Sequence, residues 1–204
     1  MALLGFTRRL PPFERAKIGS LPSKMLRGFF GLLVIILSFA AVGPVHAQES
    51  KEYQLKAAFL YNFAQFVKWP PNAFPAADAP FDIGILGDDP FGSALEETVQ
   101  GETIDNHRMT VVRAQRLEDL KDCQMIFVCR SEEGQVGEVL SQLGSKPVLT
   151  VSEVENFAQN GGDIDFYLSG GKVRFEINPQ SALRCGLKIS SQLLNLGKIV
   201  TGRN

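Results

Sequence analysis

Two stretches of alternating apolar and polar residues flank a Gly-Gly pair in the last quarter of the chain. Residues 164–168 read IDFYL and residues 173–177 read VRFEI, with Gly170-Gly171 between them. A period of two on both sides of such a pair predicts two half-buried antiparallel strands joined by a tight turn. The expected apolar pairs across the turn are Leu168 with Val173, Phe166 with Phe175, and Ile164 with Ile177. The apolar sides of the two strands then coincide.

The residues after this hairpin predict a final helix. Asn178 is a suitable N-cap, and Pro179 suits the first helical position. From there to Val200 the apolar residues follow helical spacing in two stripes: Leu183, Leu187 and Leu194 form the first, and Ile189, Leu193, Leu196 and Val200 form the second. A helix that packs on a core with one face needs only one apolar stripe, so the two stripes together are wider than such a helix requires. Either the helix is buried on most sides, or part of its surface contacts another protein.

The preceding residues alternate between helical and strand patterns. An aromatic-rich helix is expected over residues 50–69, and it ends at Trp69-Pro70-Pro71 because proline cannot continue a helix. Buried strands are expected at 81–86, 109–112, 123–129 and 147–151, and helical segments at 89–100, 117–122, 131–143 and after the capping-box pattern of Ser152 and Glu155. This alternation predicts an α/β fold. We expect a three-layer α/β/α sandwich, with a mostly parallel sheet, a C-terminal antiparallel hairpin and a final helix.

The N-terminal residues have the pattern of a secretory signal. An uncharged run of 15 residues, Gly28 to Val42, follows six basic residues and precedes Val45-His46-Ala47. The pattern predicts a signal peptide over residues 1–47, with cleavage between Ala47 and Gln48, and a single domain over 48–204. Residues 1–24 could precede the true start, because Met25-Leu26-Arg27 opens a signal of ordinary length. An uncleaved anchor is the alternative, although a membrane span needs roughly 20 residues.

Processing changes the net charge of the chain. Residues 48–204 contain 15 basic and 21 acidic residues, which gives a net charge of −6. A moderately acidic domain argues against nucleic acid or anionic lipid as a partner. We therefore expect no nucleic-acid binding, and no membrane insertion once the signal is cleaved.

Three cysteines are disulfide candidates in an exported protein: Cys123, Cys129 and Cys185. Cys123 and Cys129 fall on one predicted strand, where six residues span roughly 20 Å, so they cannot pair with each other. Only Cys185 could bond to one of them. At least one thiol then stays reduced or pairs between chains. The alternative is that all three are small buried apolar residues.

The sequence contains few residues suited to catalysis or to cofactor binding. The loop from Gly87 to Gly92 follows a strand, but its glycines match no phosphate-binding motif, and Asp88-Asp89 would repel phosphate. His107 is the one histidine left after cleavage, and no serine nucleophile motif or Cys-x-x-Cys pair accompanies it. We expect no enzyme activity, no metal site and no cofactor. A periplasmic enzyme whose activity depends on His107 is the alternative.

One face of the hairpin carries the candidate binding residues. Tyr167 lies opposite Arg174, with Asp165 and Glu176 beside them. A cation–π contact or a cross-strand ion pair would account for Arg174 structurally. The alternative is that Tyr167, Arg174 and Glu176 bind a small anion or a protein partner.

Several segments of the chain resemble the YfiR family of exported bacterial proteins. They are AAFLYNF at 57–63 with Trp69-Pro70, ILGDDPFG at 85–92, Gly161-Gly162, VRFEIN at 173–178, and GLKISS at 186–191 with Leu193-Leu194. Together they extend from about Tyr53 to Val200. The resemblance implies a small periplasmic α/β protein, often a homodimer, that is not an enzyme.

The resemblance also implies a regulatory role. The best-known member represses an inner-membrane diguanylate cyclase by holding its periplasmic sensor region inactive, and redox or envelope stress releases it. Other members would serve histidine kinases. A nucleotide-like ligand is also implied, with Arg174 and Glu176 in the motif to test first. The known repressor depends on intramolecular disulfides, whereas this chain has only three cysteines.

Overall fold

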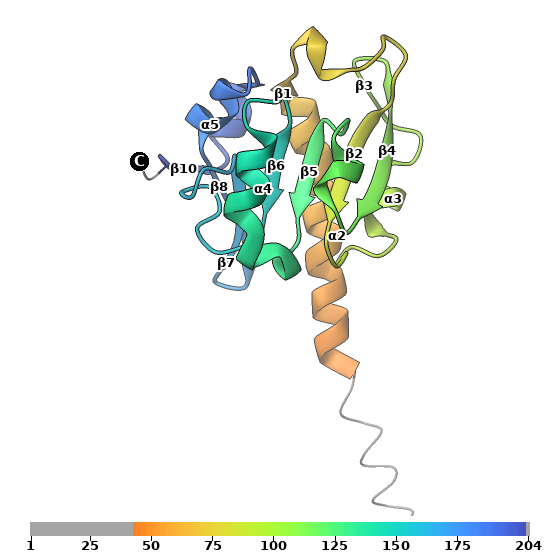
Figure 1. The fold of residues 1–204 in the computed structure, drawn as a ribbon. Helices are drawn as coiled ribbons and strands as arrows, with labels where there is room; N and C mark the ends of the chain where they lie inside the picture. Colours follow the sequence, from red (N-terminus) through yellow and green to blue (C-terminus); the bar gives the residue numbers. More distant parts are fainter. Residues whose placement is uncertain (1–42, 203–204) are drawn as a thin grey trace, which may run out of the picture. The chain divides into compact units, whose positions relative to one another are not determined.

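A central mixed sheet with helices on both faces organises the chain in the computed structural model, which describes residues 43–202 (Figure 1). The predicted signal peptide therefore lies largely outside the described residues. The helices are α2 (Gly43–Phe66), η1 (Pro71–Ala73), α3 (Ala94–Val99), η2 (Leu117–Leu120), η3 (Arg130–Gln135), α4 (Val136–Leu143), α5 (Pro179–Arg184) and α6 (Ser191–Leu194). The strands are β1 (Val67–Lys68), β2 (Phe81–Leu86), β3 (Thr103–Ile104), β4 (His107–Ala114), β5 (Met125–Val128), β6 (Leu149–Ser152), β7 (Ile164–Ser169), β8 (Lys172–Ile177), β9 (Lys188–Ile189) and β10 (Lys198–Ile199).

Eight strands form the main sheet, in the order β10-β8-β7-β6-β5-β2-β4-β3. Five neighbouring strands of this sheet are mutually parallel: β4, β2, β5, β6 and β7. Their order is that of the doubly wound α/β folds, in which the chain first adds β4 on one side of β2 and then β5 on the other. The antiparallel pairs are β7 with β8 and β3 with β4. The predicted α/β fold with a mostly parallel sheet is confirmed.

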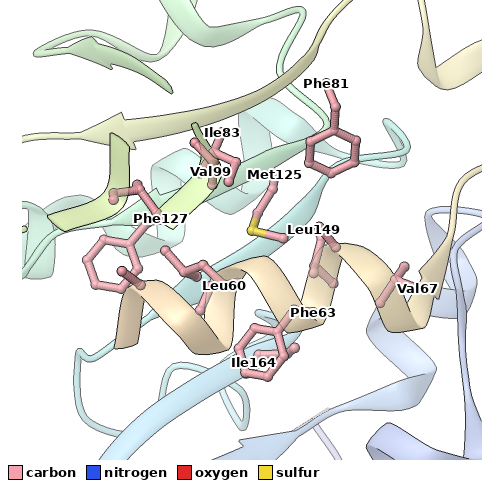
Figure 2. Close-up of a cluster of buried hydrophobic side chains, with 14 of the residues drawn as sticks. Leu60, Phe63, Val67, Phe81, Ile83, Val99, Met125, Phe127, Leu149 and Ile164 are labelled. Carbon is pink, nitrogen blue, oxygen red and sulfur yellow. The ribbon is translucent and has the colours of Figure 1, made fainter. Parts of the chain in front are cut away.

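Each face of the sheet packs against its own hydrophobic cluster. The larger cluster joins α2 and α3 to one face, and Figure 2 shows Leu60, Phe63 and Val67 of α2 directed at strand side chains such as Met125 and Ile164. The smaller cluster joins α4 and η2 to the opposite face. Helices on both faces of the sheet form the expected three layers.

The hairpin has the register that its sequence predicts. Leu168 lies opposite Val173, Phe166 opposite Phe175, and Tyr167 opposite Arg174. Gly170 and Gly171 both have positive φ, at 60° and 71°, as a type I′ turn requires. The helix cap is also confirmed, because the Asn178 side chain accepts a hydrogen bond from the backbone N–H of Ser181.

The single long helix predicted from Pro179 to Val200 is wrong. The helix ends at Arg184, and Gly186 follows with φ of 76°, a conformation that ordinary residues adopt only at a cost. Lys188-Ile189 then pairs with Val67-Lys68, and the Ser190 side chain caps the short helix α6. Lys198-Ile199 finally adds β10 in parallel beside β8, so the hairpin does not form the edge of the sheet.

Two other helix predictions need correction. The segment after Ser152 forms turns instead of the expected helix, because the Ser152 hydroxyl accepts a bond from Val154 N only two residues ahead. The helix expected from Asp89 begins at Ala94. Asp89 instead closes a local turn with Phe91 N and pairs with Arg113. Both serine and aspartate side chains compete in this way with regular helix starts.

Candidate functional site

The carboxyl ends of the parallel strands define one edge of the sheet, where ligands of doubly wound folds usually bind. At the β2–β5 switch point this edge is filled with aromatic rings. Phe91, which follows β2, packs edge-on against Tyr53 of α2 and Phe127 of β5, with ring centroids 5.5 Å and 4.9 Å apart. The usual crevice is therefore occupied by the protein itself.

An open cavity lies farther along the same edge. Strand β6 ends at Ser152, which lies opposite Asp165, while β7 continues as far as Ser169 with only β8 beside it. The cavity beside this extension has a volume of about 360 Å³. Its lining residues are Glu52, Lys56, Arg130, Glu153, Glu155, Asn156, Gln159, Asp165, Phe166, Tyr167, Leu168 and Glu176.

A buried ion pair forms one wall of the cavity. The Lys56 side chain of α2 is 4% exposed, and its ammonium group pairs with Glu153 and lies 2.5 Å from Glu52 Oε1. Tyr53 donates a 2.9 Å hydrogen bond to Glu153 Oε1. Burial and the nearby Glu153 charge both raise the pKa of Tyr53, so its hydroxyl stays protonated and donates. A buried ammonium needs such partners, since an unpaired buried charge is strongly destabilising.

Two carboxyl groups face each other across the hairpin at the cavity. Asp165 and Glu176 are cross-strand partners and are 5% and 8% exposed. Glu176 accepts 2.6 Å bonds from Lys198 and Gln159. Asp165 Oδ2 accepts from Phe157 N at 3.0 Å, whereas within residues 43–202 its Oδ1 atom has no donor. Burial raises the pKa of Asp165 to about 7, and the Glu176 charge adds to this shift.

Another buried carboxyl group, that of Asp163, lies directly before β7. Asp163 accepts bonds from the backbone N–H and the hydroxyl of Thr150, both 2.8 Å long. Burial raises its pKa to about 6 in spite of these bonds. The native state therefore holds protons on Asp163 and Asp165 more tightly than an unfolded chain does, where a carboxyl of this kind titrates near 3.8.

The pH dependence of stability follows from these two carboxyls. Protonated Asp163 and Asp165 stabilise the native state fully below about pH 4. The Asp163 contribution is lost as the pH rises through about 6, and the Asp165 contribution as it rises through about 7. We expect the contribution of these groups to the free energy of unfolding to fall across this window. Asp165→Asn should flatten the upper part of the fall, whereas the exposed Asp119→Asn control should not. Urea unfolding at a series of pH values measures this, and an unchanged slope in Asp165→Asn would contradict it.

The structure brings two of the three predicted binding residues to the cavity. Tyr167 and Glu176 line it, while Arg174 is exposed and lies outside the lining. A binding role for the three residues stays a prediction. The sequence analysis missed Lys56 and Glu153. Lys56 is three residues after Tyr53 and four before Leu60 on the buried stripe of α2, and a lysine at such a position is a signal of buried pairing.

Asp165 also has a different environment from the one expected. Its position on the polar face of the hairpin suggested exposure, but the loop from Val154 to Gly162 covers that face. Phe157 N and the Gln159 side chain of this loop bind Asp165 and Glu176, respectively. The loop thus converts an outer strand face into the wall of a cavity.

The three cysteines are free thiols in this structure. Cys123 packs in the smaller hydrophobic cluster and Cys129 in the larger one, and burial raises the pKa of each thiol to about 12. Cys185 is half-buried, and its Sγ lies 3.7 Å from Gly144 O. At such pKa values the two buried thiols are poor nucleophiles.

His107 has a structural environment. Its ring stacks on Phe74 with centroids 3.8 Å apart, and its Nδ1 lies 2.6 Å from Ala79 O. In the part of the chain that the structure describes, no cluster of His, Cys, Asp or Glu side chains is arranged to hold a metal ion. None of the described helices is long and apolar enough to cross a membrane.

The fold and the cavity define a class: a doubly wound α/β domain with a small, acid-rich cavity beside a C-terminal hairpin. Comparison with family models then identifies the family. The YfiR/HmsC-like model matches residues 53–198, so the chain belongs to the YfiR/HmsC-like family, which is regulatory and is not a known enzyme family. No protein of curated function matches the sequence.

Proposed function

We propose that this protein is a periplasmic regulator that binds the periplasmic domain of an inner-membrane sensor and restrains it. The family assignment supports a regulatory role, and the pattern of a cleaved signal supports export. A diguanylate cyclase is the proposed output, which connects the protein to cyclic di-GMP. A sensor histidine kinase is the alternative partner.

The C-terminal segment beside β8 is the surface proposed to bind the sensor. Leu183, Leu196 and Ile199 are 65%, 69% and 49% exposed, and they lie within a stretch of 17 residues. Three exposed large apolar side chains in one short segment favour this segment as a protein–protein contact. This is the observation that carries the proposal, together with the open edge strand β10, whose backbone groups can pair with another chain.

Restraint is explained as a population shift. A protein that binds only the inactive conformation of a sensor lowers the fraction of active sensor by its difference in affinity for the two conformations. A shift from mostly active to mostly inactive sensor requires a difference of about 10⁴-fold in affinity. A signal acts by weakening the contact, and no chemical step is needed.

Substitutions in the C-terminal segment test the surface. We expect Leu196→Asp to reduce co-purification of the membrane sensor at least about tenfold, because a charge would be buried against an apolar partner. Leu55→Asp is the matched control, since Leu55 is exposed on α2 and lies outside this segment. Circular dichroism checks that both variants are folded. Equal recovery of the sensor with both variants would contradict the proposed surface.

A further inference from the structure

Two buried oxygen atoms at the cavity lack a hydrogen-bond donor. In residues 43–202 they are Asp165 Oδ1 and Gln159 Oε1, and both belong to side chains that line the cavity. Buried acceptors are normally satisfied, and each exception calls for an explanation. Two orphaned acceptors at one cavity indicate that the cavity is built to receive donors.

The charges at the cavity point to the same kind of ligand. Five carboxyl side chains line it, against the two cations Lys56 and Arg130. Lys56 is already paired with Glu52 and Glu153, and Glu176 is paired with Lys198. The pairing leaves Asp165 and the exposed Glu155 against Arg130, so the cavity retains an excess of negative charge. Such a cavity attracts cations and repels carboxylates and phosphates.

The remaining lining is partly apolar. Tyr167 lies two residues after Asp165, beyond the end of β6, and its ring is on the same face of β7 as the Asp165 carboxyl group. Small-molecule sites combine apolar walls with a few fixed polar groups, and about 360 Å³ is near the lower end of their size range. The ligand should therefore be small, with a cationic donor group and a short apolar portion.

We propose that this cavity binds a small primary amine. The ammonium group, which has three N–H donors and no acceptor, bonds Asp165 Oδ1 and Gln159 Oε1. The hydrocarbon portion of the ligand lies against the ring of Tyr167, on the same face of β7 as Asp165. This inference goes beyond the regulatory role, because amine binding needs no sensor and can be measured on the protein alone.

Three probes of equal carbon number test the proposal: n-hexylamine, 1-hexanol and hexanoate. Calorimetric titration of the purified full chain, at a pH above about 7 so that Asp165 is ionised, should detect binding of hexylamine. Hexanol should bind at least about tenfold more weakly, because it lacks the charge, and hexanoate should not bind. Binding of hexanoate or of a nucleotide, with none of hexylamine, would overturn the proposal.

Variants separate this site from non-specific attraction by an acidic protein. Asp165→Asn should weaken hexylamine binding at least about tenfold, while Glu118→Gln, which removes an exposed carboxylate on η2, should leave it unchanged. If Asp165→Asn does not fold, Gln159→Met removes the second acceptor and should also weaken binding. The proposed amine site would be wrong if the folded cavity variant bound hexylamine as tightly as the wild type. Loss of amine binding leaves sensor co-purification as a separate measurement, so the two proposals fail independently.

Discussion

Glu153→Ala is expected to lower the free energy of unfolding by about 3–5 kcal/mol, the cost of removing one partner from a buried ion pair. Glu153 is the main partner of Lys56, and both side chains are almost fully buried. The substitution leaves the ammonium with Glu52 alone and also removes the acceptor of the Tyr53 hydroxyl. Urea denaturation with a linear extrapolation measures the change.

Two further variants show whether the loss comes from an uncompensated charge. Glu155→Ala removes an exposed carboxylate two residues away, so it should change stability by less than about 0.5 kcal/mol. The double variant Lys56→Met/Glu153→Leu replaces both charges with apolar groups and should recover most of the loss, since such replacements are often neutral. A double variant as unstable as Glu153→Ala would show that shape, and not the unpaired charge, is responsible.

Phe63→Ala should cost about 3–5 kcal/mol, because it opens a cavity where α2 packs on the hairpin. Phe63 is fully buried, and its ring centroid lies 5.6 Å from that of Phe166 and 5.0 Å from that of Phe175. Thermal and urea unfolding measure the loss. Leu55→Ala, at an exposed position of the same helix, is the control and should stay within about 0.5 kcal/mol. A similar effect in both variants would contradict the packing described for α2.

The hairpin and the parallel strands could be predicted because their information is local. A period of two fixes which side chains of β7 and β8 face the core, and two glycines in sequence fix the turn. The prediction of one long helix after Pro179 failed because contacts with distant parts of the chain determine the structure there. The apolar spacing from Leu183 to Val200 fits a helix, but the chain is held by a pairing of Ile189 with Val67, more than 100 residues earlier. Gly186 and Gly197 were the local signals of a break. Gly197 has the Phe175 ring so close that a Cβ would lie 2.7 Å from it.

The candidate site could be predicted only in part for the same reason. Tyr167 and Glu176 follow from the hairpin register, whereas the contact of Lys56 with Glu153 joins positions 97 residues apart in sequence. Likewise, burial of Asp165 depends on a loop whose path was predicted as a helix. Strand β8 connects the two proposed regions, since Glu176 lines the cavity and its carboxylate binds Lys198 of β10 at 2.6 Å. The ion pair of Glu176 with Lys198 thus connects the cavity directly to the C-terminal segment.

Cellular cyclic di-GMP in a strain lacking this protein tests the central claim most directly. If the protein restrains a diguanylate cyclase, deletion should raise cyclic di-GMP several-fold, wild-type protein should restore the lower level, and Leu196→Asp should fail to do so although it is exported and folded. Unchanged cyclic di-GMP after deletion, together with no membrane sensor recovered with the wild-type protein, would contradict the account.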